Sequence, residues 1–288
     1  MSRTNEINRV AIVGGGTMGA GIAEVCARAD IDVTVIEATE ERAGPTRDAI
    51  ERSLQRAVGA GKLEAGAAEA AKQHVAVSAD LADVAGADAA IEAITEDEVQ
   101  KRELFERLDR ELPEAAFLAT NTSSVPIMKL AAATERPERI LGLHFFNPVP
   151  MLPLVEVVRS IMTAQETLAV ARAFVTERLG KQTIDSEDRA GFVVNALLVP
   201  YLLSAIRMYE SGFASKEDID QGMVLGCAHP MGPLALADLV GLDILEAVSE
   251  SLHQEFRDQS TVPPPLLRRM VEAGLLGRKT GRGFYEYR

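Results

Sequence analysis

Cysteine is scarce in this sequence: only Cys26 and Cys227 occur among its 288 residues. There is no C-x-x-C motif and no cluster of cysteine with histidine, which excludes a zinc site of familiar spacing and a disulfide framework. We expect Cys26 within a helix and Cys227 in a glycine-rich turn. Two unlinked cysteines fit a reducing compartment, so the sequence predicts a cytoplasmic protein without a metal.

Long apolar runs and positive charge are also scarce. No stretch reaches the roughly 18 apolar residues of a membrane span. Residues 1–9 are polar and lack the apolar core of a signal peptide. A formal net charge of −13 argues against nucleic acid or an anionic membrane as partner, because both attract lysine and arginine. Local positive groups must therefore hold any anionic ligand.

The sequence does contain a glycine cluster directly after an apolar, β-branched stretch, and a helical pattern follows it. Gly14, Gly16 and Gly19 fit the pattern G-x-G-x-x-G. The first glycine permits a tight turn, the second lets a pyrophosphate approach the backbone, and the third lets the helix pack on the strand. The phosphates would meet the helix N-terminus. Glycine clusters also make ordinary strand-to-helix turns, so this pattern alone is weak. A P-loop is excluded because no Gly-Lys-Ser/Thr ending is present.

An acidic residue after the second predicted strand favours the dinucleotide interpretation. Residues 32–36 predict that strand, and Glu37 follows it, 18 positions beyond Gly19. An acid at this place would accept a hydrogen bond from a ribose 2′-hydroxyl and repel the additional phosphate of NADP. The sequence therefore predicts NAD binding, with NAD preferred over NADP.

Strand and helix patterns alternate through the first two thirds of the chain, which predicts an α/β fold with a Rossmann-type doubly wound sheet. Further strands are expected at 89–94, 116–119, 140–145, 154–158 and near 183–184, and helices at 40–58, 63–73, 99–112 and 164–179. We expect an NAD-binding domain over residues 1–187 and a smaller all-α domain over 188–288. The boundary should fall in the charged, glycine-containing link 185–191.

The second domain shows only helical patterns. Residues 192–208 are apolar on nearly every side, and such a helix must be buried on every side. In a domain of this size that points to a subunit contact, so we expect a homodimer through the C-terminal domain. Pro200 should kink this helix and Ser215 should cap the next one. Further helices are expected at 234–239, 243–256 and 265–273.

Two polar groups in the first domain permit both a structural and a functional interpretation. Residues 120–124 follow a strand and would face the cofactor crevice, yet polar turns of this kind are often helix caps. Arg52 and Arg56 lie on one helical face beside Ser53, with Lys62 just beyond. This face is either a solvated basic surface or a clasp for a phosphorylated substrate.

His144 and Glu156 form the sharpest candidate catalytic pair. Each falls in or at a strand of the same predicted sheet, and Glu156 is an acid inside an otherwise apolar strand. Burying an unpaired carboxylate is costly, so we expect a partner, and an imidazole suits an enzyme. Oxidising an alcohol requires a base for the hydroxyl proton. A histidine whose far nitrogen meets a carboxylate can serve as that base.

Several runs together resemble the L-3-hydroxyacyl-CoA dehydrogenase family over essentially the whole chain. They are GGGTMG at 14–19, NTSS at 121–124, HFFNP at 144–148, GFVVN at 191–195, HPMGP at 229–233 and KTGRGFY at 279–285. Within that family the sequence most resembles the stand-alone bacterial 3-hydroxybutyryl-CoA dehydrogenases, since no hydratase module is attached.

The resemblance implies an NAD-dependent, reversible oxidation of an L-3-hydroxyacyl-CoA to the 3-ketoacyl-CoA. It implies that His144 is the general base, that Glu156 orients it, and that Ser123 and Asn195 meet the reacting oxygen or the thioester carbonyl in a cleft between the domains. The implied cofactor contacts are Gly14, Gly16, Thr17, Met18, Gly19, Glu37, Glu96, Lys101, Asn147 and Lys279. The implied coenzyme A contacts are Ser53 and a nearby base. Some relatives carry a lysine where this sequence has glycines at 59 and 61, which leaves Arg56 or Lys62 as substitutes.

Two alternatives stay open at this point. Relatives of the same fold oxidise small hydroxy acids with a similar His-Glu pair and bind no coenzyme A. A catalytically silent NAD-binding protein is the second alternative, and the presence of Ser123, His144, Glu156 and Asn195 together argues against it.

Overall fold

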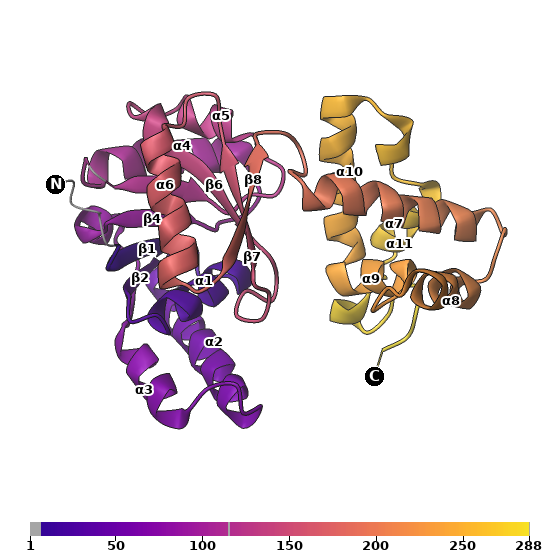
Figure 1. The fold of residues 1–288 in the computed structure, drawn as a ribbon, viewed down its shortest axis with the longest axis horizontal. Helices are drawn as coiled ribbons and strands as arrows, with labels where there is room; N and C mark the ends of the chain where they lie inside the picture. The colour runs from indigo at the N-terminus through magenta and orange to yellow at the C-terminus, as the bar shows by residue number, and fades with distance from the viewer. Residues whose placement is uncertain (1–6, 115, 288) are drawn as a thin grey trace. The chain divides into compact units, whose positions relative to one another are not determined.

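The computed structural model describes residues 7–114 and 116–287. The chain divides into two compact units, Met1–Arg189 and Ala190–Arg288, which Figure 1 shows as ribbons.

The first unit is built on one eight-stranded sheet with the order β3-β2-β1-β4-β5-β6-β7-β8. Its strands are β1 Arg9–Val13, β2 Asp32–Ile36, β3 Val75–Ser78, β4 Ala89–Glu92, β5 Phe117–Thr120, β6 Ile140–Phe145, β7 Leu154–Arg159 and β8 Gln182–Glu187. Neighbouring strands are parallel except for β6 and β7. The chain leaves β1 toward β2 and β3 and returns to β4 on the other side. A topological switch point therefore lies between the carboxyl ends of β1 and β4, where open α/β sheets bind ligands.

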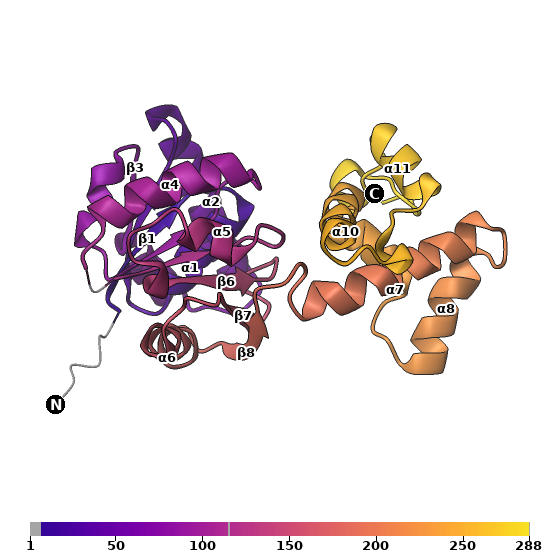
Figure 2. The same ribbon diagram turned by 90° about the horizontal axis from the view of Figure 1, so that it is seen from above.

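Helices cover both faces of this sheet. They are α1 Thr17–Ala27, α2 Glu40–Gly59, α3 Ala65–Gln73, α4 Glu98–Glu111, α5 Ile127–Ala131 and α6 Gln165–Ala173. Buried residues of α1, α2, α3 and α6 form one apolar core with alternate residues of the strands. Figure 2 shows α4 on the opposite side of the strands from α6. The alternation of strands and helices confirms the predicted α/β doubly wound fold.

One local expectation was wrong and one strand was missed. The segment 164–179 is not one α-helix, because α6 ends at Ala173 and a π-helical turn occupies Phe174–Arg178. The division between the two units falls after Arg189, inside the expected stretch 185–191, of which residues 185–187 belong to β8. The short edge strand β3 was not anticipated.

The second unit is helical. Its helices are α7 Val194–Glu210, α8 Lys216–Cys227, α9 Pro233–Val240, α10 Leu242–Phe256 and α11 Pro265–Glu272. Ser215 caps α8 by accepting the backbone N–H of Asp218, as expected. Cys227 was expected in a turn but is the last residue of α8.

The apolar helix α7 is not buried on every side within its own unit. Leu202, Leu203 and Ile206 lie in the core of the unit. Leu197, in contrast, is 74% exposed and Met208 is 41% exposed. The single chain leaves these side chains exposed, so their burial in a subunit contact and the homodimer both stay predictions.

Among the described residues, none of the helices combines the length and the apolar character that a membrane span requires. Within the same ranges, no group of three or more His, Cys, Asp and Glu side chains is placed to hold a metal ion.

The two cysteines should differ sharply in reactivity. Cys26 is fully buried in α1, and this burial raises the pKa of its thiol to about 12, whereas Cys227 is exposed. Since the thiolate is the reacting species, Ellman's reagent at about pH 8 should label Cys227 rapidly and Cys26 only after unfolding. Absorbance should report one fast equivalent from the native protein, and none from the Cys227→Ser variant. Rapid release of a second equivalent from native protein would contradict this.

Candidate active site

The glycine turn joins β1 to α1, and its glycines meet different surroundings. Gly14 has a φ of +99°, and a Cβ there would lie 2.7 Å from the carbonyl oxygen of Ala93. A Cβ at Gly19 would lie 1.8 Å from the carbonyl oxygen of Gly14, so only glycine lets α1 start this close to the turn. Apart from its chain neighbours, no described residue would have an atom within 4 Å of a Cβ at Gly16. The backbone at Gly16 thus faces open space at the N-terminus of α1, which suits a pyrophosphate.

Glu37, directly after β2, turns its carboxylate toward this glycine turn. A Cβ built on Gly15 would lie 2.5 Å from Oε1 of Glu37. The same carboxylate accepts a hydrogen bond from the Thr46 hydroxyl and pairs with Nε of Arg42 at 3.1 Å. Glu37 is 5% exposed. The structure therefore brings the predicted ribose-binding acid to the predicted phosphate-binding turn.

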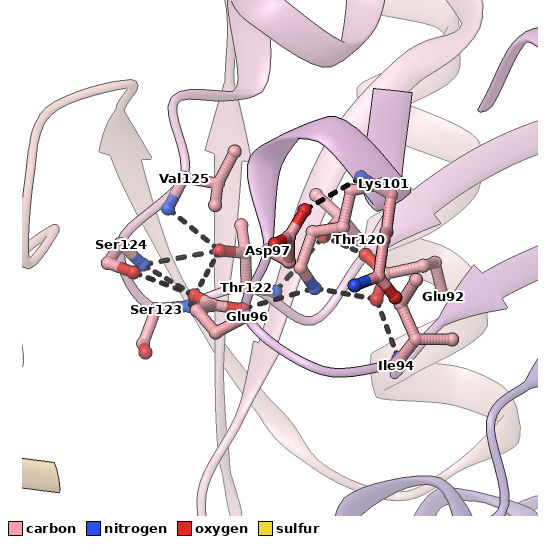
Figure 3. A network of polar contacts seen from close by, with 11 residues as sticks. Glu92, Ile94, Glu96, Asp97, Lys101, Thr120, Thr122, Ser123, Ser124 and Val125 are labelled. Carbon is pink, nitrogen blue, oxygen red and sulfur yellow. Dashed lines mark hydrogen bonds and ion pairs between the residues drawn. The ribbon is translucent and has the colours of Figure 1, made fainter. Parts of the chain in front are cut away.

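A buried ionic cluster occupies the carboxyl end of β4 (Figure 3). Glu92, the last residue of β4, is fully buried and accepts hydrogen bonds from Nζ of Lys101 at 2.6 Å, the Thr120 hydroxyl at 2.6 Å and the backbone N–H of Ile94 at 2.7 Å. Lys101 also pairs with Oε2 of Glu96 at 3.1 Å. Lys101 lies in the first turn of α4, and this helix begins two residues after Glu96. From there its side chain reaches both acids. Its ammonium, on a 1% exposed side chain, contacts two carboxylates of the chain itself.

Glu96 organises the loop that follows β5. Its Oε1 accepts the backbone N–H of Ser123 at 2.9 Å and of Ser124 at 3.0 Å, and the hydroxyl groups of Thr122 and Ser124 also donate to it. In Figure 3 the Ser123 side chain points away from this carboxylate. The Ser123 hydroxyl makes no hydrogen bond to any residue that the structure describes. The loop is thus fixed by its backbone while the Ser123 hydroxyl stays available.

The Glu96 cluster should contribute to acid sensitivity. Burial alone would raise the pKa of the Glu96 carboxyl, but the Lys101 ammonium and the hydroxyl groups of Thr122 and Ser124 together lower this pKa below its ordinary value. Ionised Glu96 therefore stabilises the fold above the ordinary glutamate pKa of about 4.3, and this is lost as the pH falls through the lower folded pKa.

The corresponding measurement is urea unfolding of the wild type and of Glu96→Gln between neutral pH and the acid limb. The wild type should be more stable at neutral pH, and the difference in free energy of unfolding should shrink as the pH falls through the folded pKa of Glu96. A difference that stays constant down to the lowest pH would show that Glu96 titration does not contribute.

His144 and Glu156 lie directly opposite each other on β6 and β7. The antiparallel register pairs their Cα atoms, so both side chains point to the same face of the sheet. Nδ1 of His144 is 2.7 Å from Oε2 of Glu156. The Glu156 side chain is fully buried and that of His144 is 8% exposed. An ionised carboxylate can only accept, so this contact calls for a proton on Nδ1 of His144.

Two contacts are formed by the residues around His144 at the end of β6. Asn121, directly after β5, accepts the backbone N–H of Phe145 at 2.9 Å. The Phe146 ring lies edge-on to the imidazole, with centroids 4.7 Å apart. Asn147 follows as an exposed residue. The carboxyl ends of β4, β5 and β6 therefore carry Glu92, the Ser123 loop and His144 along one edge of the sheet, beside the glycine turn.

Two predicted site residues belong to the second unit. Asn195 is half-buried in the first turn of α7. Lys279 pairs with Oδ2 of Asp243 at 2.5 Å, and its side chain is 43% exposed. Its turn is held because Gly277 packs against the backbone of Asp238, where a Cβ would lie 2.3 Å from the carbonyl oxygen.

The predicted substrate-binding residues lie on and after α2. Ser53 is half-buried, whereas Arg56 and Lys62 are exposed. Within residues 7–114 and 116–287, neither Arg56 nor Lys62 forms an ion pair. Both interpretations of this basic face, solvated surface or phosphate clasp, remain compatible with these positions.

Sequence reasoning missed Gly15 and Glu92. Gly15 is required because a side chain there would overlap Glu37 and Thr46. Glu92 is an acid at the end of an apolar strand, the same signal that led to Glu156, and Lys101 lies nine positions further along the chain.

The doubly wound sheet, the open glycine turn and the acid after β2 define the class of Rossmann-type dinucleotide-binding proteins. Comparison with known families narrows this class. Residues 9–189 match the family model of the 3-hydroxyacyl-CoA dehydrogenase NAD binding domain, and residues 191–287 match that of the 3-hydroxyacyl-CoA dehydrogenase C-terminal domain. The chain belongs to the 3-hydroxyacyl-CoA dehydrogenase family, as its motifs suggested, and is an NAD-dependent enzyme.

Individual relatives match over almost the full length. The chain is 54% identical over 285 residues to the 3-hydroxybutyryl-CoA dehydrogenase of Mycobacterium tuberculosis, covering 99% of this chain and 100% of the relative. It is 43% identical to the human mitochondrial hydroxyacyl-coenzyme A dehydrogenase, covering 98% and 92%. The crystal structure of (S)-3-hydroxybutyryl-CoA dehydrogenase from Ralstonia eutropha superposes with a TM-score of 0.92 at 42% identity, covering 98% and 100%.

Proposed function

We propose that the protein catalyses the reversible, NAD-dependent oxidation of (S)-3-hydroxyacyl-CoA to 3-ketoacyl-CoA, with 3-hydroxybutyryl-CoA as the favoured substrate. The bacterial relatives that carry the name 3-hydroxybutyryl-CoA dehydrogenase support this substrate. The observation that carries the proposal is the pairing of His144 with the buried Glu156.

In this proposal His144 is the general base. Because Glu156 accepts from Nδ1, the lone pair of Nε2 can take the proton of the substrate hydroxyl group. The resulting imidazolium is stabilised by the carboxylate of Glu156 at 2.7 Å. In the reverse direction the imidazolium returns this proton to the ketone oxygen.

Ser123 and Asn195 provide hydrogen bonds to substrate oxygens. The Ser123 hydroxyl is available because Glu96 holds the backbone of its loop and not its side chain. In the proposal it donates to the reacting oxygen or the thioester carbonyl, and the Asn195 amide binds the other. These contacts would orient the hydroxyl group toward the base.

The residues of the first unit fit the cofactor. The open backbone at Gly16, with Thr17 and Met18 in the first turn of α1, would hold the pyrophosphate, and Glu37 would bind the adenosine ribose. When bound, NAD supplies the acceptor for the hydride that leaves C3 of the substrate. Glu96, Lys101, Asn147 and Lys279 are the remaining candidates for contacts to the cofactor.

Coenzyme A binding is assigned to the basic face of α2. Arg56 and Lys62 are exposed cations in a chain of net charge −13, and Ser53 lies one turn before Arg56. Phosphate groups suit such a place because local positive charge must offset the negative net charge.

The test compares NADH-dependent reduction of acetoacetyl-CoA with reduction of free acetoacetate. A coenzyme A enzyme should turn over only the thioester efficiently, and replacing Arg56 and Lys62 by glutamine should raise KM for it with little change in kcat. Equal turnover of free acetoacetate would favour a dehydrogenase of small hydroxy acids. Absence of NADH oxidation across acyl-CoA substrates would refute the proposed activity.

We also infer that the protein is cytoplasmic. We infer further that it forms a homodimer through the second unit of each chain. Support comes from large apolar side chains left exposed on this unit, since Leu197, Phe213 and Leu225 are 74%, 79% and 81% exposed. Light scattering at micromolar concentration should give twice the mass of the 31.0 kDa chain. The variant Leu197→Glu should shift this mass toward the monomer, whereas Val99→Glu, an exposed apolar position of the first unit, should not.

A further inference from the structure

The loop that carries Ser123 is held at two places by carboxylates. At its near end, Glu96 accepts the backbone N–H groups of Ser123 and Ser124. At its far end, Asp188 accepts the backbone N–H of Ile127 through Oδ1 at 2.8 Å and that of Met128 through Oδ2 at 2.7 Å. Only three residues separate Ser123 from Ile127, so the two carboxylates hold the two ends of a short span of chain that begins at Ser123.

Asp188 is itself fixed by the sheet. It follows β8 directly, and its backbone N–H donates to the carbonyl oxygen of Arg159 at 3.1 Å, which continues the pairing of β7 with β8. The segment that Asp188 binds is also fixed, because the Ile127 side chain packs over Gly142 of β6. A Cβ built on Gly142 would lie 3.0 Å from Cδ1 of Ile127. The Asp188 carboxylate thus joins the last strand of the sheet to the start of α5.

The two ends of the loop are anchored in different ways. Glu96 depends on Lys101, whose ammonium is shared with the buried Glu92. Asp188 depends on the strand pairing of β8. Thr122, directly before Ser123, closes the loop because its Oγ1 accepts the backbone N–H of Val125 at 2.8 Å. Losing one anchor would leave the other in place, so the loop should shift without the fold being lost.

We propose that Asp188 is a positioning residue for Ser123. By holding the N–H groups of Ile127 and Met128, Asp188 sets where the loop, and with it the Ser123 hydroxyl, lies relative to His144. This inference rests on the function proposed above, in which Ser123 binds a substrate oxygen. Asp188 contacts no reacting atom, and it acts on the reaction only through the placement of Ser123.

The first experiment is a double-mutant cycle on kcat/KM for acetoacetyl-CoA with NADH. Asp188→Asn keeps the shape of the side chain but turns one acceptor into a donor that faces a backbone N–H. Misplacing a binding group in this way should lower kcat/KM about 10- to 100-fold. In the Ser123→Ala background, the same change should cost only about twofold, because the hydroxyl group that Asp188 positions is already gone. Equal losses in both backgrounds would overturn the proposal.

The matched control is Asp88→Asn. Asp88 also accepts two consecutive backbone N–H groups, those of Asn8 and Arg9, each at 2.9 Å, but at the amino end of β1. This variant should leave kcat/KM unchanged in both backgrounds. A loss as large as that of Asp188→Asn would show that any such carboxylate is needed for the fold, and would overturn the assignment.

Hydrogen exchange tests the anchor without relying on activity. Peptides covering residues 121–131 should exchange faster in Asp188→Asn than in the wild type or in Asp88→Asn. In Asp188→Asn, peptides of β1 and α1 should exchange as in the wild type. Unchanged exchange in 121–131 would overturn the proposal whatever the activity. An inactive wild type would refute the proposed function alone, because this measurement would still decide whether Asp188 holds the loop.

Discussion

Replacing His144 by glutamine is expected to lower kcat/KM for acetoacetyl-CoA reduction about 10²- to 10⁴-fold, the usual cost of losing a well-placed general acid or base. Glutamine can still bond to Glu156 across the strand pair, so the sheet should hold together. It cannot gain or lose a proton at neutral pH. NADH binding, measured by fluorescence titration, should stay within about twofold, because the loss falls on the chemical step and not on cofactor binding.

The control for this prediction is His74→Gln. His74 also pairs with a carboxylate, since its Nδ1 lies 2.7 Å from Oδ1 of Asp32, but its side chain is 30% exposed near the start of β3. A histidine-carboxylate pair at a distance from the crevice should contribute nothing to the rate. Retained activity in His144→Gln, or an equal loss in His74→Gln, would show that the His144–Glu156 pair is not the base.

The general plan of the fold could be predicted from the sequence because strong local signals agree with each other. Apolar runs rich in β-branched or long apolar residues placed β1, β2, β6 and β7 correctly. The strand β3 was missed because its four residues, Val75–Ser78, lie at the sheet edge and show no fully buried position. The end of α6 was missed because a π-helical turn keeps the apolar spacing of a continuing helix.

The site could be predicted only in part, because contacts between side chains of neighbouring strands depend on the strand register. The sequence placed His144 and Glu156 in strands, but a slip of one residue would send one of them to the other face of the sheet. The antiparallel register that pairs them is a tertiary property. The same holds for Asp188 and Ile127, which are 61 positions apart and meet only once β8 has joined the sheet.

Substitutions in the glycine turn are expected to have the second large effect. One of them should lower stability and the other should weaken cofactor binding. In Gly19→Ala the new Cβ would meet the carbonyl oxygen of Gly14 at 1.8 Å, and neither backbone can move without shifting α1 on β1. The expected cost is about 3 kcal/mol of unfolding free energy. Urea unfolding should show this loss without any cofactor, and NADH binding should fall with it because the turn is displaced.

In Gly16→Ala the new Cβ has no atom of a described residue within 4 Å apart from its chain neighbours, and a φ of −64° suits alanine. Stability should therefore change by at most about 1 kcal/mol. The methyl group would occupy the space through which the pyrophosphate approaches the backbone. Losing one hydrogen bond to a charged phosphate costs about 1.5–3 kcal/mol, so NADH should bind about 10- to 100-fold more weakly. Two variants three positions apart should thus fail for different reasons, one in folding and one in binding. Unchanged NADH affinity in Gly16→Ala would place the pyrophosphate somewhere other than this turn.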